Sequence, residues 1–170
     1  MTTTGQFVRL GFIDGAAAAA GIERLGDARK PLTDKLAVSA DPDAALEGLL
    51  RLVDALDEAH DGAGAAMLRE VADDEGTAMR LCTVLGASTA LTHHLVRHPD
   101  HWRELTDPTL GSTRAAAYAV REAMLAAVGA DPRADVPVAG LPDAEAVDAL
   151  RVEYRRILLR LAARDLAHHV

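Results

Sequence analysis

The sequence predicts an all-helical protein, and three observations carry that prediction. Alanine and leucine, which favour helices, supply 35 and 23 of the 170 residues. Aromatic residues make up only 3% of the chain, and β-branched residues are scarce. No segment alternates apolar and polar residues convincingly, as a half-buried strand would. We therefore expect an irregular bundle of about seven to nine helices, with the longest at the C-terminus.

The first half should hold five helices behind a lead-in, residues 2–14, that has no clear period. They are expected over residues 16–25, 32–40, 42–56, 63–71 and 75–85. The third is the clearest, because Asp41 can cap its first turn and Pro42 suits its first helical position. Its apolar residues repeat every three or four positions, which indicates one buried face.

In the second half, Ser88 is expected to cap a helix that Pro99 stops, with one or two more turns over 100–105. An Ala-rich helix follows over 112–128 and ends at Gly129. Prolines and glycine make 130–142 a loop, which is a possible sub-boundary within one helical region spanning residues 1–170.

The last predicted helix runs from Pro142 to Val170. We expect the core of the C-terminal half to form around its apolar stripe, which consists of Leu150, Ile157, Leu158 and Leu161. The pattern reaches the last residue without a stop signal, which suggests part of a longer protein.

Net charge, hydropathy and cysteine content argue against several classes of function. The net charge is −8, which argues against nucleic acid as a partner. No apolar run is long enough for a membrane span, and no secretory signal is visible. With a single cysteine, these features favour a cytoplasmic protein. The charge is uneven, because residues 150–170 carry +3 and residues 1–149 carry −11.

Histidines and carboxylates give the first candidate sites. His94 and His98 lie four apart, with His101 after a proline, and such spacing can hold zinc. No further ligand completes a set, so surface histidines are the favoured interpretation.

Asp41-Pro-Asp43 and Asp143-Ala-Glu145 have the acidic spacing of magnesium-dependent nucleotidyl transfer, but they sit where helices start, which favours capping. Cys82, among apolar residues, is expected in the core.

Arginines on the last helix give the remaining candidate. Arg156, Arg160 and Arg164 are spaced four apart, and we call them the arginine ladder. Like charges at that spacing repel, and no acidic residue alternates with each of them. We expect the ladder to be largely exposed and to contact phosphates or an acidic surface of a following domain.

Two stretches are more specific than any short motif. Residues 85–102 read Leu-Gly-Ala-Ser-Thr-Ala-Leu-Thr-His-His-Leu-Val-Arg-His-Pro-Asp-His-Trp, and residues 150–166 read Leu-Arg-Val-Glu-Tyr-Arg-Arg-Ile-Leu-Leu-Arg-Leu-Ala-Ala-Arg-Asp-Leu. With residues 9–14 and 41–52, they resemble the N-terminal region of the bacterial glutamine synthetase adenylyltransferase family, the actinobacterial branch in particular. Residues 103–149 match least.

The resemblance implies a longer, bifunctional parent enzyme. One half adds AMP from ATP to a tyrosine of glutamine synthetase, the other removes it by phosphorolysis, and both need magnesium and respond to nitrogen status. The chain would be the leading helical part of the removing half. The family's Gly-x-Ser-Asp-x-Asp metal motif is not in these residues. No catalytic, cofactor-binding or metal-binding residue is therefore predicted here, and the chain alone should be inactive.

The implied partners are glutamine synthetase and the downstream domains of the same chain. Two alternatives remain open from the sequence. A stand-alone helical protein-interaction module fits the composition equally well, and chain length in cells would separate it from a piece of the enzyme. The second alternative is a helical metal-binding bundle, and metal analysis of the purified protein would test it.

Overall fold

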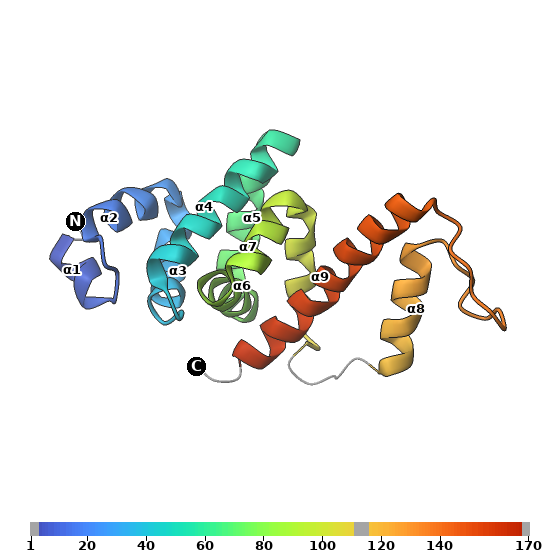
Figure 1. Ribbon diagram of the computed structural model, residues 1–170. Coiled ribbons are helices and arrows are strands. Elements are labelled where there is room, and N and C mark those ends of the chain that lie inside the picture. Colours follow the sequence, from blue (N-terminus) through green and yellow to red (C-terminus); the bar gives the residue numbers. More distant parts are fainter. Residues whose placement is uncertain (1–3, 111–115, 168–170) are drawn as a thin grey trace.

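The structure, a computed structural model, describes residues 4–110 and 116–167 and confirms the all-helical fold (Figure 1). Within those residues there are nine α-helices, two short 3-10 helices and no strand. In chain order they are α1 (Thr4–Arg9), α2 (Gly15–Arg24), η1 (Gly26–Ala28), α3 (Arg29–Ala37), α4 (Pro42–Ala59), α5 (Ala63–Asp73), α6 (Glu75–Ala87), α7 (Thr89–Arg97), η2 (Pro99–Leu105), α8 (Ala117–Ala127) and α9 (Asp143–Ala167). The longest is α9, as predicted.

Helix caps follow the sequence signals. The Asp41 carboxylate accepts a hydrogen bond from the Ala44 amide at 2.9 Å at the start of α4. The Ser88 hydroxyl accepts one from the Leu91 amide at 3.3 Å at the start of α7. Gly129, with φ of +69°, follows the end of α8 in a conformation that favours glycine. These three predictions are confirmed.

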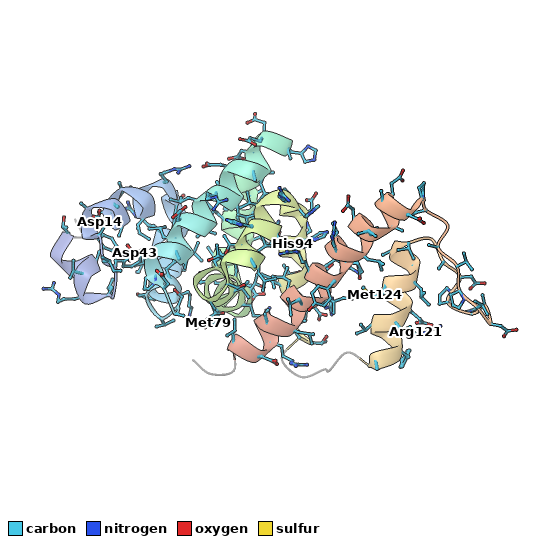
Figure 2. The ribbon with its side chains drawn as sticks, in the orientation of Figure 1. Asp14, Asp43, Met79, His94, Arg121 and Met124 are labelled. Atoms are coloured by element: carbon cyan, nitrogen blue, oxygen red, sulfur yellow. The ribbon has the colours of Figure 1, made fainter. Side chains whose placement is uncertain are left out.

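The lead-in contains a short helix, α1, that the sequence analysis missed. Phe7 of α1 is buried and packs edge-to-face on Phe12, with ring centroids 5.7 Å apart. The Asp43 carboxylate accepts a hydrogen bond from the Ile13 amide at 2.8 Å, which ties the lead-in to α4 (Figure 2). Because α1 has only six residues, tertiary packing must stabilise it, and a period search cannot find it.

The predicted boundaries at the C-terminal half need adjustment. The helix predicted over 112–128 begins at Ala117, since Ala116 has extended backbone angles. Residues 111–115 lie outside the described residues, and so do residues 168–170 of the predicted last helix. No helix in the described part of the chain has the length and hydropathy required to cross a membrane.

The main hydrophobic core is centred on α4 and α6. The latter packs against α3, α4 and α9 and buries seven of its residues, Cys82 among them. This confirms Cys82 as a core residue, and burial raises the pKa of its thiol to about 12. From η2, Trp102 and Leu105 enter the same core.

Helix α9 meets this core through residues other than those predicted. Leu159 and Ala163 are fully buried, whereas Leu158 is 37% exposed. The other members of the predicted stripe, Leu150, Ile157 and Leu161, are only partly buried. The predicted stripe is therefore wrong as the core contact. Its residues lie beside the buried face, partly toward α8, because α9 packs on α8 as well as on α6, α7 and η2.

A second, smaller hydrophobic cluster lies at the start of α9. It consists of Val128, Ala130 and Ala146, with Leu125 and Leu150 packed against it. Helix α8 contributes no fully buried residue and lies beside α9, on the side away from α1–α7 (Figure 1). The predicted sub-boundary near residues 130–142 falls at this cluster and stays a prediction.

Candidate functional site

The arginine ladder lies on α9 within a cluster of ion pairs. Two nitrogens of Arg156 donate to the two carboxylate oxygens of Glu153, both at 2.8 Å, and a third donates to Glu104 at 2.7 Å. Arg160 donates to the other oxygen of Glu104 at 2.9 Å and to Asp107 at 3.0 Å. The ladder is thus joined to η2 and the residues just after it.

The ion pairs of Arg156 are partly buried, unlike pairs on the open surface. The side chains of Glu153 and Glu104 are only 12% and 18% exposed, and that of Arg156 is 35% exposed. Burial acts to raise the pKa of Glu104, but hydrogen bonds from Arg160 and Arg156 and their charges outweigh it, so that its pKa is lowered. Glu104 is therefore ionised at neutral pH and bridges two arginines.

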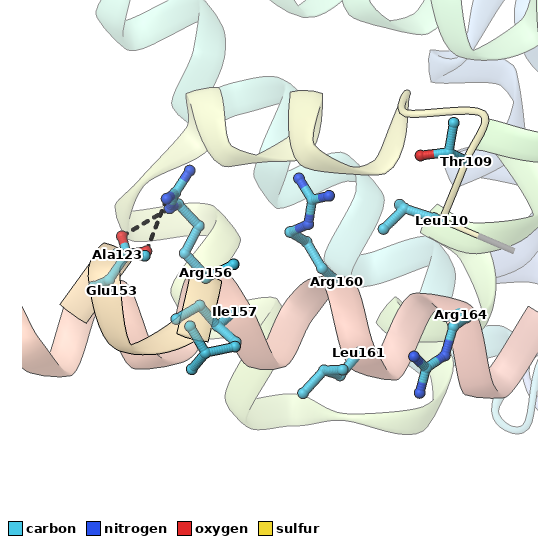
Figure 3. Close-up of a pocket in the computed structure, with 11 residues that line it drawn as sticks. Thr109, Leu110, Ala123, Glu153, Arg156, Ile157, Arg160, Leu161 and Arg164 are labelled. Carbon is cyan, nitrogen blue, oxygen red and sulfur yellow. Dashed lines mark hydrogen bonds and ion pairs between the residues drawn. The ribbon is translucent and has the colours of Figure 1, made fainter. Parts of the chain in front are cut away.

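Arg164 differs from the other two members of the ladder. It bonds Asp165, the next residue, at 2.8 and 2.6 Å, and its own side chain is 16% exposed. Its guanidinium points away from the η2 segment, toward which Arg156 and Arg160 point (Figure 3). Each arginine of the ladder has an acidic partner. The expectation of a largely exposed ladder without such partners is wrong.

Sequence reasoning missed Glu104 and Asp107 as the partners. They lie 52 to 56 positions before the arginines that they bind. Glu104 lies in η2 and Asp107 lies two residues after its end. Nothing local in the sequence indicates that these two side chains meet α9.

A pocket of about 250 Å³ lies beside the ladder, between α8, α9 and residues 109–110 (Figure 3). One wall is apolar and includes Leu110, Val120, Ile157 and Leu161. The other carries the three arginines and Glu153. Because the arginines are already paired with carboxylates, this wall offers little free positive charge, and the pocket suits a small apolar group better than a phosphate.

The three histidines noted for their spacing lie close together in the structure. The ring centroid of His94 is 5.0 Å from those of both His98 and His101, and the last two are 5.4 Å apart. One ring nitrogen of His94 lies 3.0 Å from one of His101, so one ring donates and the other accepts. In the described part of the chain, no three His, Cys, Asp or Glu side chains are arranged to hold a metal ion.

His94 is buried, which corrects the expectation of surface histidines. It lies on α7, which contacts α9, and is 3% exposed (Figure 2). Burial lowers the pKa of His94 to about 4, and the charges of His101, His98 and Arg155 add to the effect. The pKa of His101 is also lowered, first by burial. Both rings are neutral at pH 7.

The paired carboxylates do not meet. Asp41 caps α4, and Asp43 accepts from the backbone of the lead-in. Asp143 and Glu145 lie in the first turn of α9 and are exposed. The capping interpretation is confirmed for Asp41.

No family model and no solved structure matches this chain, whereas several known protein sequences are similar to it. A Cutibacterium acnes protein is 37% identical over 98% of the chain, and a Streptomyces avermitilis protein is 36% identical over 97%. A Mycobacterium tuberculosis protein is 37% identical over 94%. Each is named bifunctional glutamine synthetase adenylyltransferase/adenylyl-removing enzyme.

The match covers only part of those relatives. The chain spans 16% of the Cutibacterium protein and 15% of the other two. The resemblance stated from the sequence is confirmed. The chain is homologous to a segment that makes up about 15% of the length of the actinobacterial glutamine synthetase adenylyltransferase/adenylyl-removing enzymes.

Proposed function

We propose that this chain is a helical, non-catalytic part of the bifunctional enzyme that adds AMP to glutamine synthetase and removes it, in the control of nitrogen assimilation. The observation that carries the proposal is the 36–37% identity over 94% or more of the chain to proteins of that name. The chain would scaffold a nucleotidyltransferase domain that follows it, in the cytoplasm.

The placement of the carboxylates supports the non-catalytic role. Nucleotidyl transfer needs acidic side chains that jointly hold magnesium at the phosphates. Asp41 and Asp43 are engaged by backbone amides instead, and Asp143 lies in a different part of the fold. Magnesium and ATP would serve the parent enzyme through residues outside this chain, and glutamine synthetase would be the parent's partner.

The scaffolding role is supported by the ion pairs of α9. Through Arg156 and Arg160, the helix is tied to Glu104 and Asp107, which fixes its direction relative to the main core. Contact of Arg156, Arg160 and Arg164 with a following domain remains part of the proposal. Among the described residues, Arg164 pairs only with Asp165, an exposed neighbour, so a following domain could replace that partner with another carboxylate or a phosphate.

The non-catalytic role is tested by incubating the chain with adenylylated glutamine synthetase, inorganic phosphate and magnesium. We expect no more ADP than in the blank without enzyme, and the full-length Mycobacterium tuberculosis relative serves as the positive control. ADP release above the blank by the chain alone would overturn the non-catalytic assignment.

The interdomain role needs the longer enzyme. An Arg164→Gln change there should lower AMP removal more than AMP addition, whereas Arg133→Gln, at an exposed site, should change neither. An equal loss of both activities, or no loss, would refute a contact with the AMP-removing domain.

A further inference from the structure

A second concave surface, separate from the pocket beside the ladder, is strongly basic. It measures about 1010 Å³ and lies where α7 faces the first half of α9, with Arg51 of α4 at its edge. We call it the basic groove. Four arginines line it, and Asp148 is the one carboxylate among its described lining residues. In a chain of net charge −8, such a concentration of positive charge is local.

Most of these arginines are available to a ligand. Arg97 is exposed and has no ion pair among the described residues. Arg155 is exposed too and donates only to the Ala90 carbonyl, at 3.3 Å. Arg151 does pair with Asp148, but both side chains are more than 70% exposed, so the pair is weak.

The contrast with the ladder on the same helix is informative. Arg156 and Arg160 face η2 and are held by nearly buried carboxylates. Arg151 and Arg155 project to the groove side and meet α7, which brings Arg97, His93 and His98 instead of acids. The fold therefore pairs one arginine set of α9 with nearly buried carboxylates, whereas in the other set, within the described part of the chain, Arg151 has only the exposed Asp148 and Arg155 only a backbone carbonyl.

We propose that the basic groove binds an acidic segment of a partner polypeptide. Arginine forks pair with carboxylates, and arginines spread over three helices suit several carboxylates spaced along a chain better than one compact anion. This inference names a kind of partner and does not depend on the proposed function.

The groove's apolar contacts agree with a polypeptide ligand. Ala90, Val96 and Val152 lie among the charged residues and can contact the aliphatic part of a bound segment. The volume exceeds what a phosphate ion or a single carboxylate would fill.

The experiment measures binding of a fluorescein-labelled ten-residue polyglutamate peptide to the 170-residue chain by fluorescence anisotropy. We expect binding at low salt that weakens as sodium chloride is raised. The triple variant Arg97→Gln/Arg151→Gln/Arg155→Gln should bind about tenfold more weakly, as expected when three charge pairs are lost together. Circular dichroism melting checks that the triple variant folds. If it does not fold, the single variants Arg97→Gln and Arg155→Gln are measured instead, and each should bind the peptide a few-fold more weakly.

A matched control removes the same charge elsewhere. Arg9, Arg69 and Arg133 are exposed and lie outside the groove. The variant Arg9→Gln/Arg69→Gln/Arg133→Gln should bind the peptide within about twofold of the unchanged chain. Equal weakening by both triple variants would assign the binding to net charge and overturn the proposal, as would an absence of binding to the unchanged chain.

A competition arm separates a carboxylate ligand from a phosphate ligand. Unlabelled polyglutamate should displace the probe, whereas inorganic phosphate or tripolyphosphate at equal total charge should displace it less. If the phosphates compete better, the groove is a phosphate site, and the assignment to an acidic polypeptide is wrong.

Discussion

Arg156 joins two carboxylates that are themselves nearly buried. Removing the guanidinium leaves Glu153 and Glu104 with fewer partners, at sites where water compensates poorly. We predict that Arg156→Gln lowers the free energy of unfolding by about 1–3 kcal/mol, measured by urea denaturation. Arg151→Gln is the control, because its pair with Asp148 is exposed, and it should change stability by less than about 0.5 kcal/mol. Equal effects would mean that the buried pairs add nothing.

His94 gives a prediction of pH dependence. Its pKa is about 4 in the folded chain and about 6.5 in an unfolded one, so the unfolded state binds more protons between these values. The contribution of His94 to the free energy of unfolding is therefore fully present above pH 6.5 and is lost as the pH falls toward 4. The loss is of the order of 3 kcal/mol.

The measurement compares urea unfolding at pH 7 and pH 5. His94→Gln should reduce the fall in stability between the two, while His60→Gln, an exposed site outside the histidine cluster, should leave it unchanged. Titration of His94 by NMR gives the direct reading, and an observed pKa of 6 or above contradicts the prediction.

At the scale of elements, α9 is held to the core by Leu159 and Ala163. We predict that Leu159→Ala costs about 2–5 kcal/mol of unfolding free energy, because Leu159 is fully buried. Leu158→Ala, one position away and 37% exposed, should cost less than about 1 kcal/mol. If the two costs were reversed, α9 would bury the face predicted from the sequence.

Local signals predicted most elements but not how α9 is rotated. Caps such as Asp41 and Ser88 act within one turn, so the sequence indicates them directly. The buried face of α9 depends on Ala163, a small residue that also suits an exposed face. Because Ile157 and Leu161 are larger and apolar, the sequence pattern predicted burial of the neighbouring face instead.

The same limit applies to the candidate site. The arginine ladder was visible from its spacing, but two of its partners, Glu104 of η2 and Asp107 just after it, lie more than 50 positions earlier. Interactions at that separation depend on the packing of α6, α9 and η2 together. The histidine cluster was partly predictable for the opposite reason, because its members lie within eight consecutive residues.

At the scale of the whole molecule, charge is sorted between two sides of α9. The C-terminal 21 residues carry +3 and the remainder carries −11, so attraction between the two parts is an alternative account of the ladder. The pairs of Arg156 and Arg160 with Glu104 and Asp107 favour that account. The positive charge left over lies at the basic groove, where Arg97 adds to Arg151 and Arg155.

The two hydrophobic clusters predict unequal local stability. Helix α6 buries seven residues, five of them in the main core, whereas α8 buries none and rests on α9 beside the small cluster of Val128, Ala130 and Ala146. Opening α8 therefore exposes little apolar surface, while opening α6 requires disrupting the main core. In native-state hydrogen exchange, the amides of α8 should exchange at least about tenfold faster than those of α6.

The start of α9 supplies the internal comparison. Its amides near Ala146 should resemble those of α8, and its amides near Leu159 should resemble those of α6, because one helix takes part in both clusters. Such a gradient along a single helix cannot come from helix propensity, since fraying alone would affect both ends of α9. Uniform protection across α6, α8 and α9 would instead mean that the two clusters unfold as one cooperative unit.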